Sequence, residues 1–305
     1  MTQSSAAACV YGAPPPGLAV APEGAWQVSP LIPGAEALEA LSPDSLIAAL
    51  IAAPPGTLER RYVLALALRA LRAGAPLTIL APKDKGGSRL RSELEAFGCR
   101  VEELGRQHQR ICHAARPAAL IGIEAAIAAG GPQRLSGAGP WTQPGVFSWD
   151  REDPGSQLLI ATLPVLTGHG ADLGCGIGVL AQAVLTNAAV TRLDLAEIDR
   201  RALDAARRNV DDPRVVFHWA DVREGPPLEG LDFVVTNPPF HVEGQEDKAL
   251  GQAFIRRGRR MLRPGGAFWI VANRHLPYEA VLTEAFGRVA LKADGHGYKV
   301  YEARA

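Results

Sequence analysis

The sequence has little of what marks several common protein classes. Its four cysteines show no paired spacing of the kind that binds zinc, so we expect a reduced protein without a metal site. Lys and Arg number 32, as do Asp and Glu, and this balance excludes a broadly basic nucleic-acid-binding protein. Any contact with RNA must therefore come from a local patch of positive charge.

Long hydrophobic runs are also missing. Residues 46–53 are apolar, but this run ends at two prolines after eight residues and is too short to span a bilayer. The N-terminus has no cationic stretch followed by a long apolar core, so we expect no secretory signal. These absences predict a cytoplasmic protein without membrane contact.

What is present indicates a folded protein of two domains. The 305 residues, of which 47% are hydrophobic, suffice for two cores of ordinary size. Gly and Pro are concentrated in residues 130–145, which is typical of a linker. We therefore predict one domain over residues 1–140 and a second over residues 141–305.

A glycine-rich turn follows a short predicted strand at residues 169–173. Gly174, Gly176 and Gly178 lead into a predicted helix over residues 178–185. Glycine lets the backbone approach a ligand closely because it has no Cβ, so this unit is typical of a nucleotide-like cofactor site. A plain tight connection between strand and helix is the simpler alternative.

The spacing of these glycines leaves a rival cofactor open. A dinucleotide fingerprint would place its last small residue at Val179, whereas a count that starts at Gly176 fits through Ala181. Asp172, at the end of the strand, favours S-adenosylmethionine, because a carboxylate there can hold the turn and lie near the amino-acid end of that cofactor. We prefer methyl transfer and keep a nicotinamide site as the alternative.

Acidic residues follow the next two predicted strands. Glu197 lies 25 positions after Asp172, close to the spacing at which an acid meets ribose hydroxyls, and we assign it that role. Asp194 and Asp199 are alternatives, and a solvated acid at a strand end is the simpler interpretation. We expect Asp221 to accept a hydrogen bond from an adenine amino group, with a turn or cap aspartate as the alternative.

A proline corner follows a predicted buried strand at residues 231–236. Each proline fixes φ and restricts the residue before it, so the corner is stiff and presents carbonyl oxygens. We expect the Asn237 side-chain oxygen and the Pro238 carbonyl to accept both hydrogens of a planar amine, whose lone pair then faces the methyl group. Phe240 would stack on the ring that carries the amine. The alternative is an ordinary proline turn.

The first half of the chain shows neither a glycine-rich turn nor a proline clamp, so we expect it to bind no cofactor. Its order of helix, glycine and strand is similar to that over residues 253–271, which favours a duplicated fold. The elements predicted here are helices over residues 43–53, 58–73 and 88–97 and a strand over residues 77–80.

Over residues 144–303 the sequence resembles the bacterial ribosomal RNA guanine-N2 methyltransferases of the RsmC/RlmG type, and a fainter likeness extends over residues 60–115. Tyr298 stands where that family would have Phe. The motifs that carry the resemblance are Pro144-Gly145-Val146-Phe147-Ser148, Asp153-Pro154-Gly155-Ser156, Asn237-Pro238-Pro239-Phe240-His241, Ile270-Val271-Ala272-Asn273-Arg274, Leu276-Pro277-Tyr278 and Tyr298-Lys299-Val300-Tyr301.

The resemblance implies an α/β, Rossmann-like class I methyltransferase with a seven-stranded mixed sheet, preceded by a degenerate domain of similar fold. It implies methylation of the exocyclic N2 of a guanosine in 16S ribosomal RNA, with S-adenosylmethionine as cofactor and the RNA or small ribosomal subunit as partner. The guanosine would be turned out of its stack. We expect a monomer. The degenerate domain would bind no cofactor, and RNA recognition is one role open to it.

Three alternatives remain for the function. The large-subunit enzyme shares these motifs, the same clamp suits a protein glutamine amide, and a non-catalytic RNA-binding factor would keep only a vestigial site. The residues assigned to the acceptor are Asn237, Pro238 and Phe240, and those assigned to the cofactor are Asp172, Gly174, Gly176, Gly178, Glu197, Asp221 and Asn237.

Overall fold

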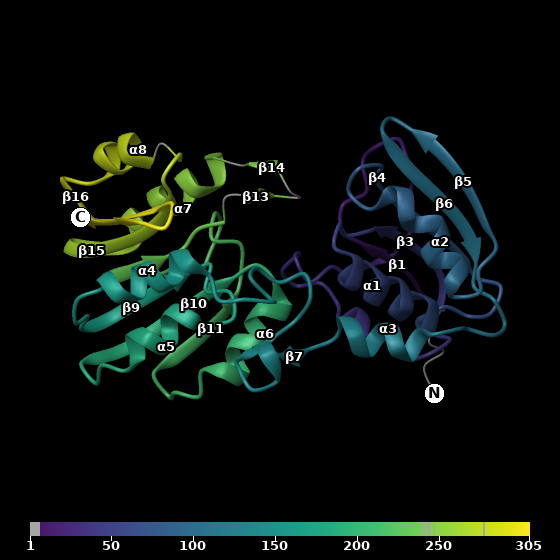
Figure 1. Ribbon diagram of the computed structural model, residues 1–305, viewed down its shortest axis with the longest axis horizontal. Helices are drawn as coiled ribbons and strands as arrows, with labels where there is room; N and C mark the ends of the chain where they lie inside the picture. The colour runs from purple at the N-terminus through teal and green to yellow at the C-terminus, as the bar shows by residue number, and fades with distance from the viewer. Residues whose placement is uncertain (1–6, 240, 243–244, 247, 277) are drawn as a thin grey trace. The chain divides into compact units, whose positions relative to one another are not determined.

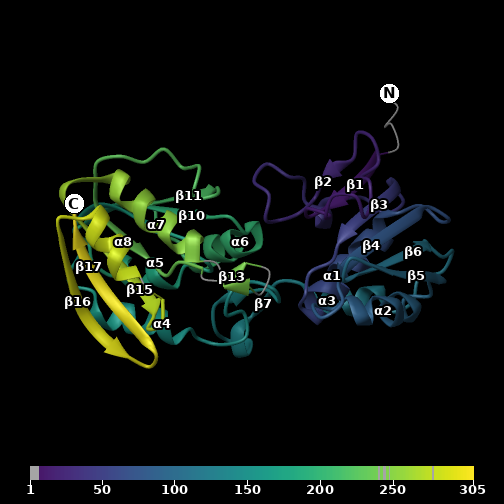
Figure 2. The same cartoon turned by 90° about the horizontal axis from the view of Figure 1, so that it is seen from above.

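The chain divides into two compact units, which Figures 1 and 2 show from two directions. Within the stretch predicted as a linker, residues 133–142 form a small hairpin of the second unit.

In the described part of the chain, no helix is both long and apolar enough to cross a membrane. The computed structural model describes residues 7–239, 241–242, 245–246, 248–276 and 278–305; the first unit comprises Met1–Pro132 and Gln143–Gly145, and the second Gln133–Thr142 and Val146–Ala305.

The first unit is built on a six-stranded sheet with the order β2-β1-β3-β4-β6-β5. Strands β2, β1, β3 and β4 are parallel, and the β5–β6 hairpin joins β4 in antiparallel orientation. The elements are β1 Ala7–Tyr11, β2 Trp26–Gln27, β3 Leu46–Ala52, α1 Thr57–Ala70, β4 Pro76–Pro82, α2 Leu90–Ala96, β5 Val101–Arg106, β6 Gln109–Ala115 and α3 Ile123–Gly130, with short 3-10 turns at Leu38–Ala40 and Gly87–Arg89.

The predicted helix over residues 43–53 is wrong, because residues 46–52 form strand β3. This strand lies between β1 and β4, and both neighbours are parallel to it. A strand in that position is covered on both sides and carries a nearly continuous apolar run, which periodicity cannot distinguish from a buried helix. The helices predicted over residues 58–73 and 88–97 correspond to α1 and α2.

The second unit holds a seven-stranded mixed sheet with the order β11-β10-β9-β12-β15-β17-β16. This confirms the predicted α/β class. In both sheets the last strand in the sequence lies between the parallel strands and the strand that precedes it in the sequence. The elements are β7 Gln133–Arg134, β8 Trp141–Thr142, α4 Pro154–Thr162, β9 Gly168–Leu173, α5 Val179–Leu185, β10 Val190–Glu197, α6 Arg200–Asn209, β11 Val215–Trp219, β12 Leu231–Thr236, β13 His241–Val242, β14 Gln245–Glu246, α7 Lys248–Met261, β15 Leu262–Asn273, α8 Tyr278–Ala285, β16 Arg288–Gly295 and β17 Tyr298–Arg304.

Helices cover both faces of this sheet (Figure 1). Leu159 of α4, Leu180 of α5 and Leu203 of α6 pack with one set of strand side chains. Phe254 of α7 and Leu282 of α8 pack with the opposite set. The carboxyl ends of the parallel strands are therefore held by a core on each side, and ligands of such sheets bind at that edge.

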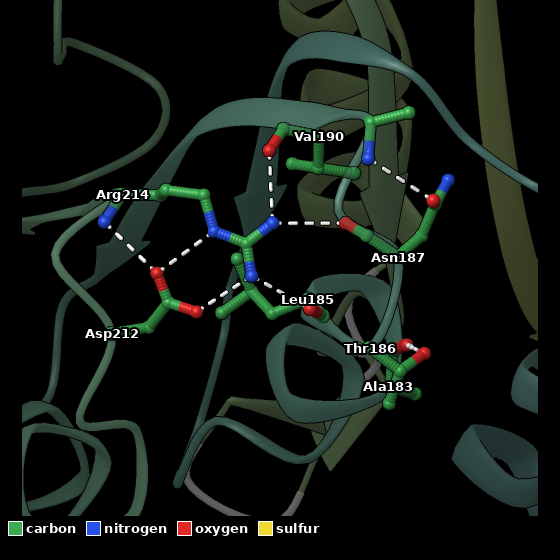
Figure 3. Close-up of polar contacts among 8 residues, drawn as sticks. Ala183, Leu185, Thr186, Asn187, Val190, Asp212 and Arg214 are labelled. Carbon is green, nitrogen blue, oxygen red and sulfur yellow. Dashed lines mark hydrogen bonds and ion pairs between the residues drawn. The ribbon is translucent and has the colours of Figure 1, made fainter.

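One arginine fixes the chain where α5 passes into β10. Arg214 donates hydrogen bonds to the backbone carbonyls of Leu185, Asn187 and Val190 at 2.7–2.9 Å, and its guanidinium is paired with Asp212 (Figure 3). The first carbonyl belongs to the end of α5, where helical hydrogen bonds are missing, the second to the loop and the third to the first residue of β10. Arg214 thus sets the start of strand β10, which ends at the candidate site.

Candidate functional site

The glycine-rich turn lies at the carboxyl end of β9. Gly174, Gly176 and Gly178 have φ values of +70°, +53° and +90°, a region that side chains with a Cβ rarely adopt. The amides of Gly174 and Cys175 donate to the carbonyl of Ala196 at 2.8 and 3.1 Å, which ties the turn to β10. A Cβ on Gly176 would meet no atom within 4 Å, so the backbone here faces open space.

Glu197, at the end of β10, holds this turn from the side. Its carboxylate accepts hydrogen bonds from the amides of Gly176 at 2.8 Å and Asp199 at 2.9 Å. Burial raises the pKa of Glu197 to about 7. A carboxylate has about four lone-pair sites, so the group can still accept a hydrogen bond from a ligand hydroxyl.

The two acids considered beside Glu197 are engaged elsewhere. Asp194 accepts hydrogen bonds from the Nε2 atoms of His169 and His218 at 2.6 and 2.7 Å and is also paired with Arg192. Asp199 caps helix α6 and pairs with Arg201. Among the contacts of the described residues, Glu197 is the acid of these three that bonds to the glycine-rich turn.

Asp172 is buried at the end of β9, and little in the described part of the chain compensates the charge of its carboxylate. Its side chain has no exposed surface, and neither carboxylate oxygen makes a hydrogen bond of ordinary geometry within the described part of the chain, although the backbone amide of Ala181 favours the charged form. Burial, with the nearby charge of Glu197, raises the pKa of Asp172 to about 8. A buried carboxylate without a partner is costly, so this position suits a ligand that brings a cationic group.

Asp221 lies beyond β11, close to Glu197 along the same edge. The amide of Ala220 donates to the Glu197 carbonyl at 3.0 Å, so Asp221 follows directly after a contact with that residue. The Asp221 carboxylate is bound by the backbone and guanidinium of Arg223, which lowers the pKa of Asp221. A ligand amine at Asp221 would share this carboxylate with Arg223.

The proline corner begins where β12 ends, next to the glycine-rich turn. Thr236 is paired with Leu173 of β9, and its hydroxyl donates to the Leu173 carbonyl at 2.7 Å. The Cδ of Pro239 lies 3.8 Å from the place of a Cβ on Gly174. Turn and corner are therefore neighbours at one edge of the sheet. Phe240 lies outside the described residues.

The amide of Asn237 is oriented by helix α4. Its Nδ2 donates to Asp153 Oδ2 at 2.8 Å and to Ser156 Oγ at 2.9 Å. The same Asp153 oxygen caps the helix by accepting from the Ser156 amide at 2.7 Å. A carboxylate can only accept, so the nitrogen of Asn237 must face Asp153 and the side-chain oxygen is left for another donor.

A cavity of about 220 Å³ lies between these elements. It brings together Gly174, Gly176 and Asn237 of the predicted site, whereas Asp172, Gly178, Glu197, Asp221 and Pro238 are not among its lining residues. The lining residues are Leu135, Pro140, Phe147, Ser148, Arg151, Glu152, Asp153, Ser156, Gln157, Gly174, Cys175, Gly176, Ile177, Val179, Leu180, Gln182 and Asn237.

The segment before α4 and the first turn of that helix supply residues that the sequence did not assign to the site. Phe147 is 54% exposed and lines the cavity. Ser148 has a φ of +50°, an uncommon conformation that often occurs at functional positions. Asp153 and Ser156 belong to motifs that carried the resemblance, and this was the only signal of their importance.

A second pair of prolines follows a strand in the first unit, without the amide residue of the predicted clamp. Pro54 and Pro55 follow β3, and Ala53 occupies the position before them. The guanidinium of Arg60 donates to both proline carbonyls, at 3.3 and 2.7 Å, and is paired with Glu93 at 2.7 Å. This corner has no amide side chain, and an arginine of the same unit already occupies its carbonyls.

Comparison with known proteins identifies a family and several relatives. Residues 139–302 match the family model described as Methyltransferase small domain. The ribosomal RNA small subunit methyltransferase C of Klebsiella pneumoniae is 40% identical over 162 residues, covering 52% of this chain and 47% of the relative. That of Hahella chejuensis is 36% identical over 167 residues, covering 53% and 48%. The chain spans about half the length of the curated relatives it matches.

A solved structure resembles the chain over a longer range. The T. thermophilus 16S rRNA N2 G1207 methyltransferase (RsmC), in complex with AdoMet and guanosine, matches with a TM-score of 0.71 and 27% sequence identity. The match covers 88% of this chain and 75% of that one. The likeness therefore extends into the first unit, beyond the range of the family model.

Proposed function

Because the chain belongs to the methyltransferase small domain family, we propose that it transfers a methyl group from S-adenosylmethionine to the exocyclic N2 of a guanosine in 16S ribosomal RNA. The matched residues 139–302 include the glycine-rich turn, its acids and the Asn-Pro-Pro corner. The relatives named above act on the small subunit, and the similar T. thermophilus enzyme was solved with AdoMet and guanosine. We therefore favour the small subunit over the large one.

The cofactor would lie along the carboxyl edge of β9, β10 and β11. S-adenosylmethionine, when bound, supplies a methyl group on a sulfonium centre and also carries a cationic ammonium. Asp172, buried and without a hydrogen bond of ordinary geometry in the described part of the chain, fits the ammonium end. Glu197 would accept from ribose hydroxyls, Asp221 would accept from the adenine amine, and the open backbone at Gly176 would allow close approach.

The single observation that carries the acceptor assignment is the direction of the Asn237 amide. Both of its hydrogens are bound by Asp153 and Ser156, so its oxygen is free to accept. With the Pro238 carbonyl, it would bind the two hydrogens of the guanine N2 amine. Because both acceptors are held in place before the substrate binds, little reorganisation is needed during transfer. Phe147 at the cavity would stack on the base.

The first unit would be a degenerate copy that binds no cofactor and serves RNA recognition. Its sheet ends like that of the second unit, and its proline corner carries Ala53 in place of an amide. The two carbonyls of that corner already accept hydrogen bonds from Arg60, so they are not available to a substrate amine.

A methyl-transfer assay tests the proposed function. Purified protein would be incubated with methyl-labelled S-adenosylmethionine and, in separate reactions, protein-free 16S RNA, protein-free 23S RNA, small ribosomal subunits and a peptide-chain release factor. We expect label in 16S RNA or the small subunit, recovered as N2-methylguanosine by mass spectrometry. Asn237→Ala should abolish transfer but retain cofactor binding in calorimetry. Label only in 23S RNA or in protein would replace the assignment.

A further inference from the structure

A cluster of basic and aromatic residues lies at the β7–β8 hairpin, which borders the cavity. Arg134 of β7 and Trp141 of β8 are paired across the hairpin. The Arg134 guanidinium carbon lies 4.7 Å from the Trp141 ring centroid, and that of Arg208, from α6, lies 4.9 Å from it. Both arginines are exposed, whereas the tryptophan is half-buried. We call these three residues the Arg–Trp–Arg platform.

The charge of this platform is not compensated by neighbouring acids. Within the described part of the chain, neither Arg134 nor Arg208 forms an ion pair, and Arg134 donates only to the Gly139 carbonyl. The adjacent Arg207, by contrast, is neutralised by Asp204 at 2.6 Å. In a chain of zero net charge, two unpaired guanidinium groups on one ring form a local positive patch.

The platform is rigidly connected to the glycine-rich turn. The Asn209 side chain accepts from the Trp141 amide at 2.7 Å and donates to the Trp141 carbonyl at 2.9 Å. Its Nδ2 also donates to the Ile177 carbonyl, within the turn, at 2.9 Å. The sequence neighbours of the platform, Leu135 and Pro140, line the cavity. A ligand on the platform is therefore held in a fixed relation to the cavity.

From these contacts we infer that the Arg–Trp–Arg platform binds the RNA strand next to the nucleotide that enters the cavity. This inference rests on the proposed function. Guanidinium groups pair with phosphates and stack on unpaired bases, and the tryptophan holds both groups against its ring before RNA arrives. A nucleotide turned into the cavity leaves its neighbours unstacked, and these neighbours are what the platform would bind.

The test compares charge-removing and charge-keeping variants in the full chain. Arg134→Gln with Arg208→Gln removes both charges, and Arg134→Lys with Arg208→Lys keeps the charge for phosphate but not the planar stacking. Arg260→Gln is the matched control, because Arg260 is exposed on α7 and has no ion pair within the described residues. Fluorescence anisotropy would measure binding to protein-free 16S RNA over a range of salt, and calorimetry would measure S-adenosylmethionine binding.

We expect the double Gln variant to bind RNA about tenfold more weakly at low salt, with a salt dependence reduced by about 1.4 in log–log slope, the loss of two phosphate contacts to a single strand. The double Lys variant should recover most of that slope. In both double variants, cofactor affinity and melting temperature should match those of the unchanged protein. Arg260→Gln should change neither RNA binding nor cofactor binding.

Two results would overturn the inference in different ways. If the unchanged protein methylates RNA and the double Gln variant binds RNA with the same affinity and slope, or Arg260→Gln weakens binding equally, the platform has no special role. If the unchanged protein neither binds nor methylates the RNA, the proposed function fails and the platform's role fails with it.

Discussion

Asn237 donates both of its amide hydrogens to helix α4, and this determines what the corner can bind. An amide turned the other way would present N–H groups to the substrate and repel an amine. Asp153 prevents that orientation because its carboxylate has no hydrogen to donate. One oxygen of Asp153 thus caps a helix and orients the acceptor side chain.

Replacement of Asp153 should test its orienting role. Asp153→Ala is expected to lower kcat for methyl transfer by about tenfold to a hundredfold, because Asn237 loses its orientation. The cofactor dissociation constant should stay unchanged. Asp153→Asn is the matched control, since one amide oxygen can still accept from both Ser156 and Asn237, and it should retain most activity. Equal loss of activity in both variants would contradict the orienting role.

The sequence could predict the residues of this site that act near a recognisable motif, but not their supports. Asp172, Glu197 and Asn237 stand at strand ends, where position alone suggests a ligand. Asp153 lies 84 positions before Asn237, and no spacing rule indicates that their side chains meet. That contact depends on how α4 packs on the sheet, which only the folded structure shows.

Asp172 predicts a dependence of cofactor binding on pH. Its pKa is raised to about 8, and binding of an ammonium group favours the carboxylate form. Affinity should therefore increase between about pH 6 and about pH 8, by at most about tenfold per pH unit. Calorimetry of the protein and of Asp172→Asn would measure this. Asp172→Asn should bind the cofactor weakly, and its affinity should depend less on pH. The remaining pH dependence would come from Glu197, whose pKa is about 7.

Stability without cofactor should change in the opposite direction. Between the ordinary pKa of an aspartate and about 8, the folded protein holds a proton on Asp172 that the unfolded chain has released. Its free energy of unfolding therefore falls as pH rises through this range. Thermal unfolding that shows the same fall in Asp172→Asn as in the unchanged protein would contradict this origin of the effect.

At the scale of whole elements, strand β3 shows where sequence patterns fail. Its run Leu-Ile-Ala-Ala-Leu-Ile-Ala lacks the alternation of a strand with one buried face, and Ala and Leu favour a helix. The two parallel neighbours of β3 decide its conformation, and both are distant in sequence. The strands of the second unit were easier to predict, because they are rich in β-branched residues or bounded by glycine and proline.

The arginine at the start of β10 provides a test at this scale. Arg214→Ala should lower the melting temperature by several degrees, because three backbone carbonyls lose their donor (Figure 3). Arg91→Ala is a suitable control, since its exposed ion pair with Glu95 should contribute little. A melting temperature equal to that of the control would mean that water replaces Arg214 without loss.

At the scale of the whole molecule, the two units repeat one plan and differ in what fills the corner. In each unit a strand is followed by one residue and then two prolines. That residue is Ala53 in the first unit and Asn237 in the second. In the first unit the guanidinium of Arg60 donates to the proline carbonyls. Duplication was predictable from the repeated order of elements. The occupied corner was not, because it depends on one side chain of α1 that reaches the proline carbonyls before that helix.

Removal of Arg60 should therefore affect the first unit and leave the second intact. Arg60 is fully buried and Glu93 nearly so, and loss of one partner leaves a buried charge, which costs about 3–5 kcal/mol. Arg60→Ala should lower the denaturant midpoint of the transition that includes the first unit. Because Asp172 and Glu197 belong to the second unit, S-adenosylmethionine binding under native conditions should not change. Arg60→Leu with Glu93→Leu, which removes both charges, should recover much of the lost stability. Equal destabilisation of the double variant would show that the hydrogen bonds to the proline carbonyls, rather than the unpaired charge, hold this unit together.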